Sequence, residues 1–141
     1  MKSSLILLLF VSVLLTSCSD ELVEDYISGT WELKVYMRND VDETSEMNIS
    51  VYEETYILDG TYSRKYFDGD QDLVEETGKF SINEDDMSIH ISDVSSIADF
   101  SAANSTLSTS TVDVITIDNT EYVYSFENGG DMHEFRFIKK D

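Results

Sequence analysis

Apolar residues recur at every second position through most of the chain, and this period is the feature that most constrains the fold. In the first such segment Trp31, Leu33, Val35 and Met37 alternate with charged or polar residues. A period of two places successive side chains on opposite faces of a β-strand, whereas an amphipathic helix needs a period near 3.6. The sequence therefore predicts half-buried strands with one apolar and one polar face.

Eight segments of this kind follow one another between residue 28 and the C-terminus, and turn-forming residues separate most of them. Short turns can join only neighbouring antiparallel strands, and closing such a meander on itself removes both exposed edges. We therefore expect an all-β fold, an eight-stranded antiparallel up-and-down barrel in a single domain. The predicted strands span residues 31–37, 47–52, 61–67, 73–82, 87–92, 112–117, 121–127 and 132–139.

Several positions interrupt the alternation and indicate turns, a bulge and a long loop. Asp59-Gly60 and Asp68-Gly69 are typical of tight turns that need a positive φ. Gly78 lies inside a predicted strand, which indicates a bulge or a bend. Residues 93–108 are rich in Ser, Ala and Asn and lose the period, so we expect a long loop, with one helical turn near residues 97–100.

The N-terminal residues follow the order of regions that is typical of a secretory signal peptide. Lys2 precedes an apolar run from Leu5 to Leu15, and Thr16 and Ser17 follow. A helix that spans a bilayer needs about 20 apolar residues, and this run is too short. We expect residues 1–17 to be a cleaved signal peptide.

Leu15-Thr16-Ser17-Cys18 resembles the lipobox of bacterial lipoproteins. The resemblance implies that Cys18, the sole cysteine, is diacylated and N-acylated, as the new N-terminus of a protein held in the outer membrane of a Gram-negative bacterium. The alternative is an ordinary signal peptide that leaves a spare thiol. Residues 18–27 are expected to be an acidic tether, and residues 28–141 the barrel. The acidic residues after Cys18 resemble tethers of lipoproteins sent to the cell surface, and the face of the membrane stays open.

Ser28-Gly29-Thr30-Trp31 resembles the Gly-x-Trp opening of lipocalins, and the mature chain resembles the short lipocalin-like lipoproteins of Bacteroidetes. The latter combine a lipobox and this opening with a Gly-x-Phe-x-Ile strand, here from Gly78, and a closing Phe-x-Phe strand around Arg136. The resemblance implies that Trp31 plugs one end of the barrel and that Arg136 stacks on it through a cation–π contact. A plain core aromatic at a strand start would account for Trp31 equally well.

The charge and the few reactive residues exclude several functions. With 29 acidic and 9 basic residues the chain lacks the cationic surface that binds nucleic acid. With His90 and His133 as the only histidines, the usual zinc sites are excluded, and both are expected at the surface. No catalytic set emerges, so we expect no enzyme activity, cofactor or resident metal. The candidate residues for adventitious calcium binding are Asp68, Asp70, Asp72, Glu84, Asp85 and Asp86.

The tyrosines of the predicted strands leave two functions open. They could face inward and line a semi-polar pocket, or face outward as strand formers and a contact surface. One function is a binding module that holds a small apolar or amphipathic molecule inside the barrel, with no residue yet assigned to the ligand. The other is a filled barrel that contacts an envelope protein or inhibits a secreted enzyme, and the volume left inside the barrel distinguishes the two. The tyrosines concerned are Tyr52, Tyr56, Tyr62, Tyr66, Tyr122 and Tyr124.

Overall fold

A computed structural model describes residues 22–47, 51–67, 72–96 and 110–141. No helix within these ranges has the length and apolar character needed to cross a membrane. The elements are α1 (Val23–Ile27), β1 (Gly29–Arg38), β2 (Val41–Asp42), β3 (Tyr52–Ile57), β4 (Thr61–Phe67), β5 (Leu73–Asn83), β6 (Ser88–Ser96), β7 (Ser110–Ile117), β8 (Glu121–Asn128) and β9 (Asp131–Lys139).

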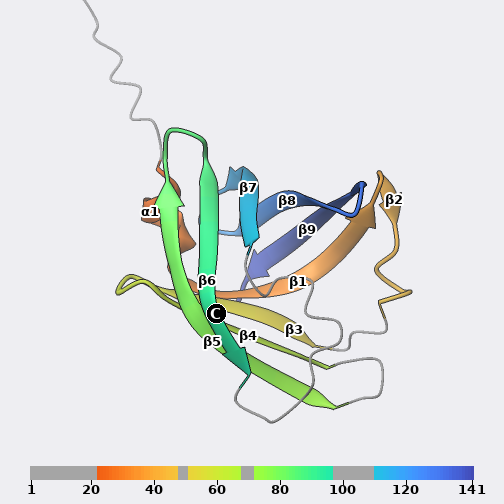
Figure 1. Ribbon diagram of the computed structural model, residues 1–141, viewed down its shortest axis with the longest axis horizontal. Helices are drawn as coiled ribbons and strands as arrows, with labels where there is room; N and C mark the ends of the chain where they lie inside the picture. The colour runs from red at the N-terminus through yellow and green to blue at the C-terminus, as the bar shows by residue number, and fades with distance from the viewer. Residues whose placement is uncertain (1–21, 48–50, 68–71, 97–109) are drawn as a thin grey trace, which may run out of the picture.

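Eight of these strands form a closed antiparallel barrel (Figure 1). Strands β3 to β9 pair with their neighbours in chain order, β1 pairs with β3, and β1 also pairs with β9 to close the ring. The two-residue β2 pairs only with the end of β1. The predicted eight-stranded up-and-down barrel is confirmed.

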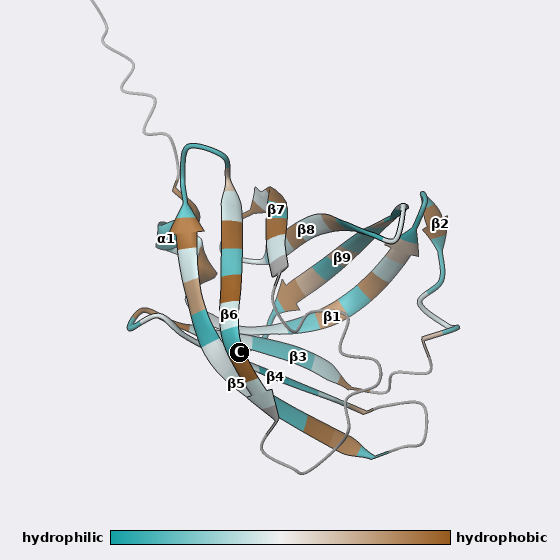
Figure 2. Cartoon of the chain, in the orientation of Figure 1, coloured by the Kyte–Doolittle hydropathy of each residue, from teal (hydrophilic) through white to brown (hydrophobic). Residues whose placement is uncertain are grey.

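The alternation in the sequence is visible as bands of hydrophobic and hydrophilic residues along the strands (Figure 2). The apolar bands face inward, where Trp31, Ile89, Ile91 and Phe137 are completely buried. In β1 the pairing with β9 shifts between Leu33 and Val35. This irregularity reverses the alternation, because it adds one residue to one strand. Beyond the shift Tyr36 is buried, and the predicted inward residues Val35 and Met37 are only half-buried.

The strand expected over residues 47–52 is wrong at its start and in phase, and its residues 48–50 lie outside the described residues. The chain turns through residues 44–47, and the strand runs instead from Tyr52 to Ile57, with Tyr52, Glu54 and Tyr56 buried. A buried glutamate at an inward position is opposite to what apolar alternation predicts. The expected loop from residue 93 is also wrong at its start, since β6 continues to Ser96. The Asp68-Gly69 turn and the helical turn near residues 97–100 lie outside the described residues.

Gly78 marks a bulge, as the sequence predicts. The pairing of β5 with β6 shifts between Thr77 and Lys79, and Asp93 on the opposite strand has a positive φ. A Cβ at Gly78 would lie 2.7 Å from the carbonyl oxygen of Ser92, so only glycine allows the two backbones to approach this closely. The predicted positive φ at Gly60 is likewise present, at 87°.

A short helix closes one end of the barrel, which we call the closed end. There α1 lies near the turns that join β3 to β4 and β5 to β6, whereas β2 and the β8–β9 turn lie at the opposite, open end (Figure 1). Val23 and Ile27 of α1 are buried, and the indole Nε1 of Trp31 donates to the Ile27 carbonyl oxygen at 2.8 Å. The last residues of the predicted tether, from Leu22, thus belong to the folded domain.

The cation over Trp31 is Lys139, and the expected stacking of Arg136 is wrong. Lys139 Nζ lies 4.9 Å from the centre of the indole ring and donates to the carbonyl oxygen of Tyr26 at 3.2 Å. Arg136 is exposed, and its Nε donates to Glu134 at 2.6 Å. The alternation along β9 explains why Arg136 cannot reach Trp31. Phe135 and Phe137 face inward, so Arg136 between them faces outward.

Replacing the two cations tests this assignment. We expect Lys139→Ala to lower the free energy of unfolding by about 1–2 kcal/mol, since it removes the cation–π contact and a hydrogen bond. Arg136→Ala should change it by less than about 0.5 kcal/mol, as is usual for an exposed ion pair. Urea denaturation followed by the fluorescence of Trp31, the sole tryptophan, measures both variants. A larger loss for Arg136→Ala would contradict the assignment.

Candidate functional site

A row of charged side chains crosses the inner face of the barrel. Cross-strand pairing places Trp31 of β1 opposite Glu54 of β3, Glu54 opposite Arg64 of β4, and Arg64 opposite Glu76 of β5. Glu54, Arg64 and Glu76 are 0%, 4% and 2% exposed. Ionised groups are rarely so deeply buried unless other groups satisfy them, so their partners define the polar part of the interior.

Four tyrosines surround the carboxylate of Glu54. The hydroxyls of Tyr124, Tyr62 and Tyr52 donate to Oε1 at 2.9, 3.2 and 3.3 Å, and that of Tyr56 donates to Oε2 at 2.8 Å. The tyrosines come from β3, β4 and β8, so the cage connects opposite walls of the barrel. All four are buried, which settles the orientation that the sequence leaves open. Tyr122 is also buried and Tyr66 is half-buried.

Burial controls the protonation of this cage. Desolvation raises the pKa of the Glu54 carboxyl above its usual value, although the charge of Arg64 and the tyrosine hydroxyls oppose the shift. Desolvation also raises the pKa of the hydroxyls of Tyr56, Tyr62 and Tyr124 well above the ordinary range. The tyrosines therefore remain protonated donors at neutral pH.

Arg64 is held on several sides. Its Nε donates to Oε2 of Glu76 at 2.9 Å, Nη2 bonds to the same oxygen, and Nη1 donates to the Tyr52 hydroxyl at 3.2 Å. The guanidinium carbon lies 5.1 Å from the ring centre of Tyr66 and 5.9 Å from that of Tyr52. Arginine suits such a site because its planar group can form a salt bridge and stack on aromatic rings at once.

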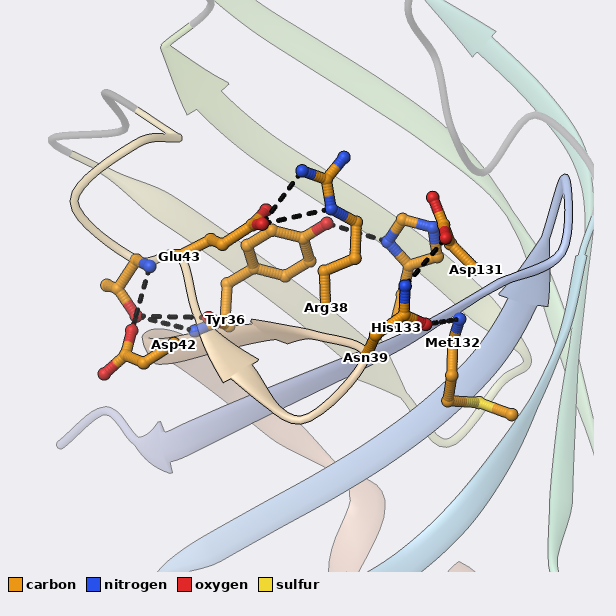
Figure 3. A network of polar contacts seen from close by, with 9 residues as sticks. Tyr36, Arg38, Asn39, Asp42, Glu43, Asp131, Met132 and His133 are labelled. Carbon is orange, nitrogen blue, oxygen red and sulfur yellow. Dashed lines mark hydrogen bonds and ion pairs between the residues drawn. The ribbon is translucent and has the colours of Figure 1, made fainter.

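The rim of the open end carries a second polar network (Figure 3). Tyr36 Oη and His133 Nδ1 are hydrogen-bonded at 2.8 Å, and the His133 ring stacks on Phe126 with centres 5.0 Å apart. Arg38 donates to Glu43 through Nε and Nη2, at 3.1 and 2.8 Å. The rim thus joins the end of β1 and the residues after β2 to the last hairpin.

Asn39 completes the rim from the turn between β1 and β2. Its side-chain amide donates to Asp131 at 2.7 Å and its Oδ1 accepts from the Met132 backbone at 2.9 Å (Figure 3). Asn39 and the following Asp40 both have a positive φ, which asparagine and aspartate tolerate better than other non-glycine residues. This tight turn positions the amide over the β8–β9 turn.

The other residues that the sequence singles out are dispersed. His90 is exposed beside Thr111, whereas His133 is half-buried at the rim rather than on the surface. Glu84 accepts from the backbone at the start of α1. Cys18, Asp68 and Asp70 lie outside the described residues. Within the described residues, no three His, Cys, Asp or Glu side chains are grouped as metal ligands.

The buried charges are the site residues that apolar periodicity does not predict. A different pattern could have indicated them. Tyr52-x-Glu54-x-Tyr56 and Tyr62-x-Arg64-x-Tyr66 have the same form, with opposite charges at the centre. On adjacent strands this form places two aromatic side chains and one charge on the same face, with the charges opposite each other.

The closed eight-stranded barrel agrees with the comparisons to known proteins. The profile of a lipocalin-like domain family matches residues 27–111, and the chain belongs to this family. The structure is similar to that of a lipocalin-like protein from Bacteroides uniformis, with a TM-score of 0.55, 16% identity, and coverage of 81% of this chain and 98% of the other. No curated protein matches the chain. The lipocalin-like fold is typically a binding fold rather than a catalytic one.

Two buried tyrosines of β8 allow a matched test of the cage. Tyr124 donates to Glu54, whereas the hydroxyl of Tyr122 has no hydrogen-bond partner among the described residues. Tyr124→Phe should lower the free energy of unfolding by about 1–3 kcal/mol, because the buried Glu54 carboxyl loses one of its hydrogen-bond donors. Tyr122→Phe should leave it unchanged or raise it slightly. Chemical denaturation at pH 7 compares them, and equal losses would contradict this description of the cage.

The raised pKa of Glu54 predicts a pH dependence of stability. A carboxyl whose folded-state pKa exceeds its unfolded value stabilises the fold below the unfolded pKa, and this contribution is lost as pH rises through the folded value. The free energy of unfolding of the wild type, minus that of Glu54→Gln, should therefore fall as pH rises from about 4.5. Glu127→Gln, on the exposed end of β8, is the control for the loss of one negative charge. A difference that rises with pH would overturn the direction of the shift.

Proposed function

We propose that this protein is a membrane-anchored lipocalin-like binding protein that holds a small apolar or amphipathic molecule at the open end of its barrel. The observation that carries the proposal is the contrast between the two halves of the interior. Next to α1, Ile27, Trp31 and Tyr122 are completely buried, whereas Met47, Tyr66 and Val94 toward the open end are only half-buried. A ligand would therefore bind near the mouth.

The composition of the mouth supports an amphipathic ligand. Half-buried Met47, Tyr66 and Val94 pack against the core and supply apolar surface. The Tyr36–His133 pair supplies polar atoms at the rim, and the buried Arg64–Glu76 pair lies beside the Glu54 cage. Binding sites for small molecules commonly combine apolar walls with a few such polar groups.

The alternative is a protein that acts through its surface. The tyrosine cage occupies the centre of the barrel, which favours a filled interior. The outer surface is strongly acidic, and such a surface can steer a basic partner, either an envelope protein or a secreted enzyme that is inhibited. This alternative requires no ligand in the barrel.

We further propose that Cys18 carries the lipid that places the domain at the outer membrane. The N-terminal sequence supports this proposal, because a charged residue, an apolar run and small residues precede the sole cysteine. A diacyl group with an additional acyl chain is sufficient for stable anchoring.

Binding of N-phenyl-1-naphthylamine, an uncharged probe that fluoresces in apolar surroundings, tests the site. With the Cys18→Ser variant beginning at residue 18, we expect a saturable rise in fluorescence. A further Met47→Gln substitution should weaken binding about fivefold, since it removes roughly 1 kcal/mol of apolar contact. Leu58→Gln makes the same kind of change at the closed end and should leave the affinity unchanged.

Two results would reject the open-end site. Equal losses of affinity for Met47→Gln and Leu58→Gln would mean that the probe binds elsewhere. No saturable binding, together with a bare chain mass in native mass spectrometry after exposure to bacterial extract, would favour the filled barrel. A mass excess that disappears on organic extraction would support the carried molecule.

A further inference from the structure

We infer that the barrel stands on its closed end against the bilayer, so that its open end points away from the lipid. This inference rests on the acylation of Cys18 proposed above. The partner is the uncharged surface of the bilayer that holds the acyl chains of the protein itself. Three observations lead to this orientation: the attachment of α1, the length of chain before it, and the apolar side chains around it.

The first observation is that α1 is fixed to the barrel. Val23 and Ile27 are 1% and 0% exposed. The backbone amides of Val23 and Glu24 donate to the carboxylate of Glu84, in the β5–β6 turn, at 3.1 and 3.0 Å. At its other end, the Ile27 carbonyl accepts from Trp31. The chain therefore enters the fold at Leu22, on the closed end.

The second observation is the short length of chain between the anchor and this point. Cys18 and Leu22 are separated by four Cα–Cα steps, which reach at most about 14 Å when fully extended. The ten-residue β1 rises roughly 30 Å, or about 23 Å along the barrel axis at the usual tilt. The tether is thus shorter than the barrel, and the open end cannot turn to face the same bilayer.

The third observation concerns the surface that the tether brings to the lipid. Exposed apolar side chains project around the closed end from the start of α1, the β3–β4 turn and the β5–β6 turn. They are Leu22, Ile57, Leu58 and Met87, and they are 42–69% exposed. A hollow of about 260 Å³ lined in part by Ile27, Leu58, Phe80 and Ile82 lies beside α1. Burying these groups at a lipid surface is favourable.

The charge of the closed end selects the kind of lipid. Glu24, Asp25, Asp59 and the acidic residues 84–86 lie around these apolar groups. Anionic headgroups would be repelled by these carboxylates, whereas zwitterionic headgroups would not. Phosphatidylcholine vesicles are therefore the appropriate membrane for a test.

The orientation can be measured by protection of introduced thiols. The full chain with Leu58→Cys at the closed end, or Val41→Cys at the open end, is made in a Gram-negative host and reconstituted in phosphatidylcholine vesicles. Both positions are exposed, at 69% and 58%. A polyethylene-glycol maleimide should label the Leu58 variant about tenfold more slowly on vesicles than in the unanchored Cys18→Ser background, as for a site uncovered a tenth of the time. The Val41 variant should react equally in both.

A longer tether supplies the matched control. Inserting twelve Gly and Ser residues between Glu21 and Leu22 should restore most of the labelling at position 58. Protection that survives the insertion would overturn the part of the inference that rests on tether length. Equal labelling of both positions on vesicles, or slower labelling at Val41, would overturn the orientation.

Intact mass separates this inference from the proposed anchor. If Cys18 carries the acyl groups and the closed end is still freely labelled, the orientation alone is wrong and the anchored binding protein stands. If the mass shows an unmodified Cys18 and the protein does not associate with vesicles, the anchor and the orientation are both wrong.

Discussion

The buried carboxylate of Glu54 is the interaction on which the interior of the barrel depends. A charge without exposure to water is tolerable only when hydrogen bonds replace its hydration. Four tyrosine hydroxyls from three strands provide this replacement, and Tyr124 reaches Glu54 from the opposite wall. The requirement explains why the centre is filled with large amphipathic rings rather than aliphatic side chains, and it fixes the pairing of β3 with β4, because a one-residue shift would move Glu54 out of the cage.

The two ends of the barrel differ in the side chains and main-chain groups that occupy them. At the closed end Trp31, Lys139 and α1 form a plug of aromatic, cationic and main-chain groups. At the open end the network around Tyr36, His133 and Asn39 connects strand ends without covering them. The domain therefore has two distinct ends: α1 plugs the closed end, and a hydrogen-bonded rim surrounds the open end. This difference gives the barrel axis a direction. This direction underlies both the proposed binding site and the proposed orientation on the membrane.

Much of the fold could be predicted from the sequence, and the departures have local causes. Alternation located β4, β5, β8 and β9, because their inward residues are mainly aromatic or aliphatic. It failed at β3, where an inward glutamate looks like a surface residue until its tyrosine neighbours are considered, and beyond Leu33, where an irregularity reverses the phase. The period itself excludes Arg136 from the interior, whereas the helix at residues 23–27 depends on contacts with Glu84 and the core that no local pattern encodes.

The cage also has a consequence for the order of folding. Glu54 receives a hydrogen bond from Tyr124, which follows 70 residues later in the chain, and the ring closes only when β9 pairs with β1. Contacts between such distant segments must overcome the entropy of closing a long loop before they stabilise anything. A nascent chain that ends before β8 would contain Glu54 without one of its donors and without a closing strand. The polypeptide thus has reason to remain unfolded until its last two strands are available.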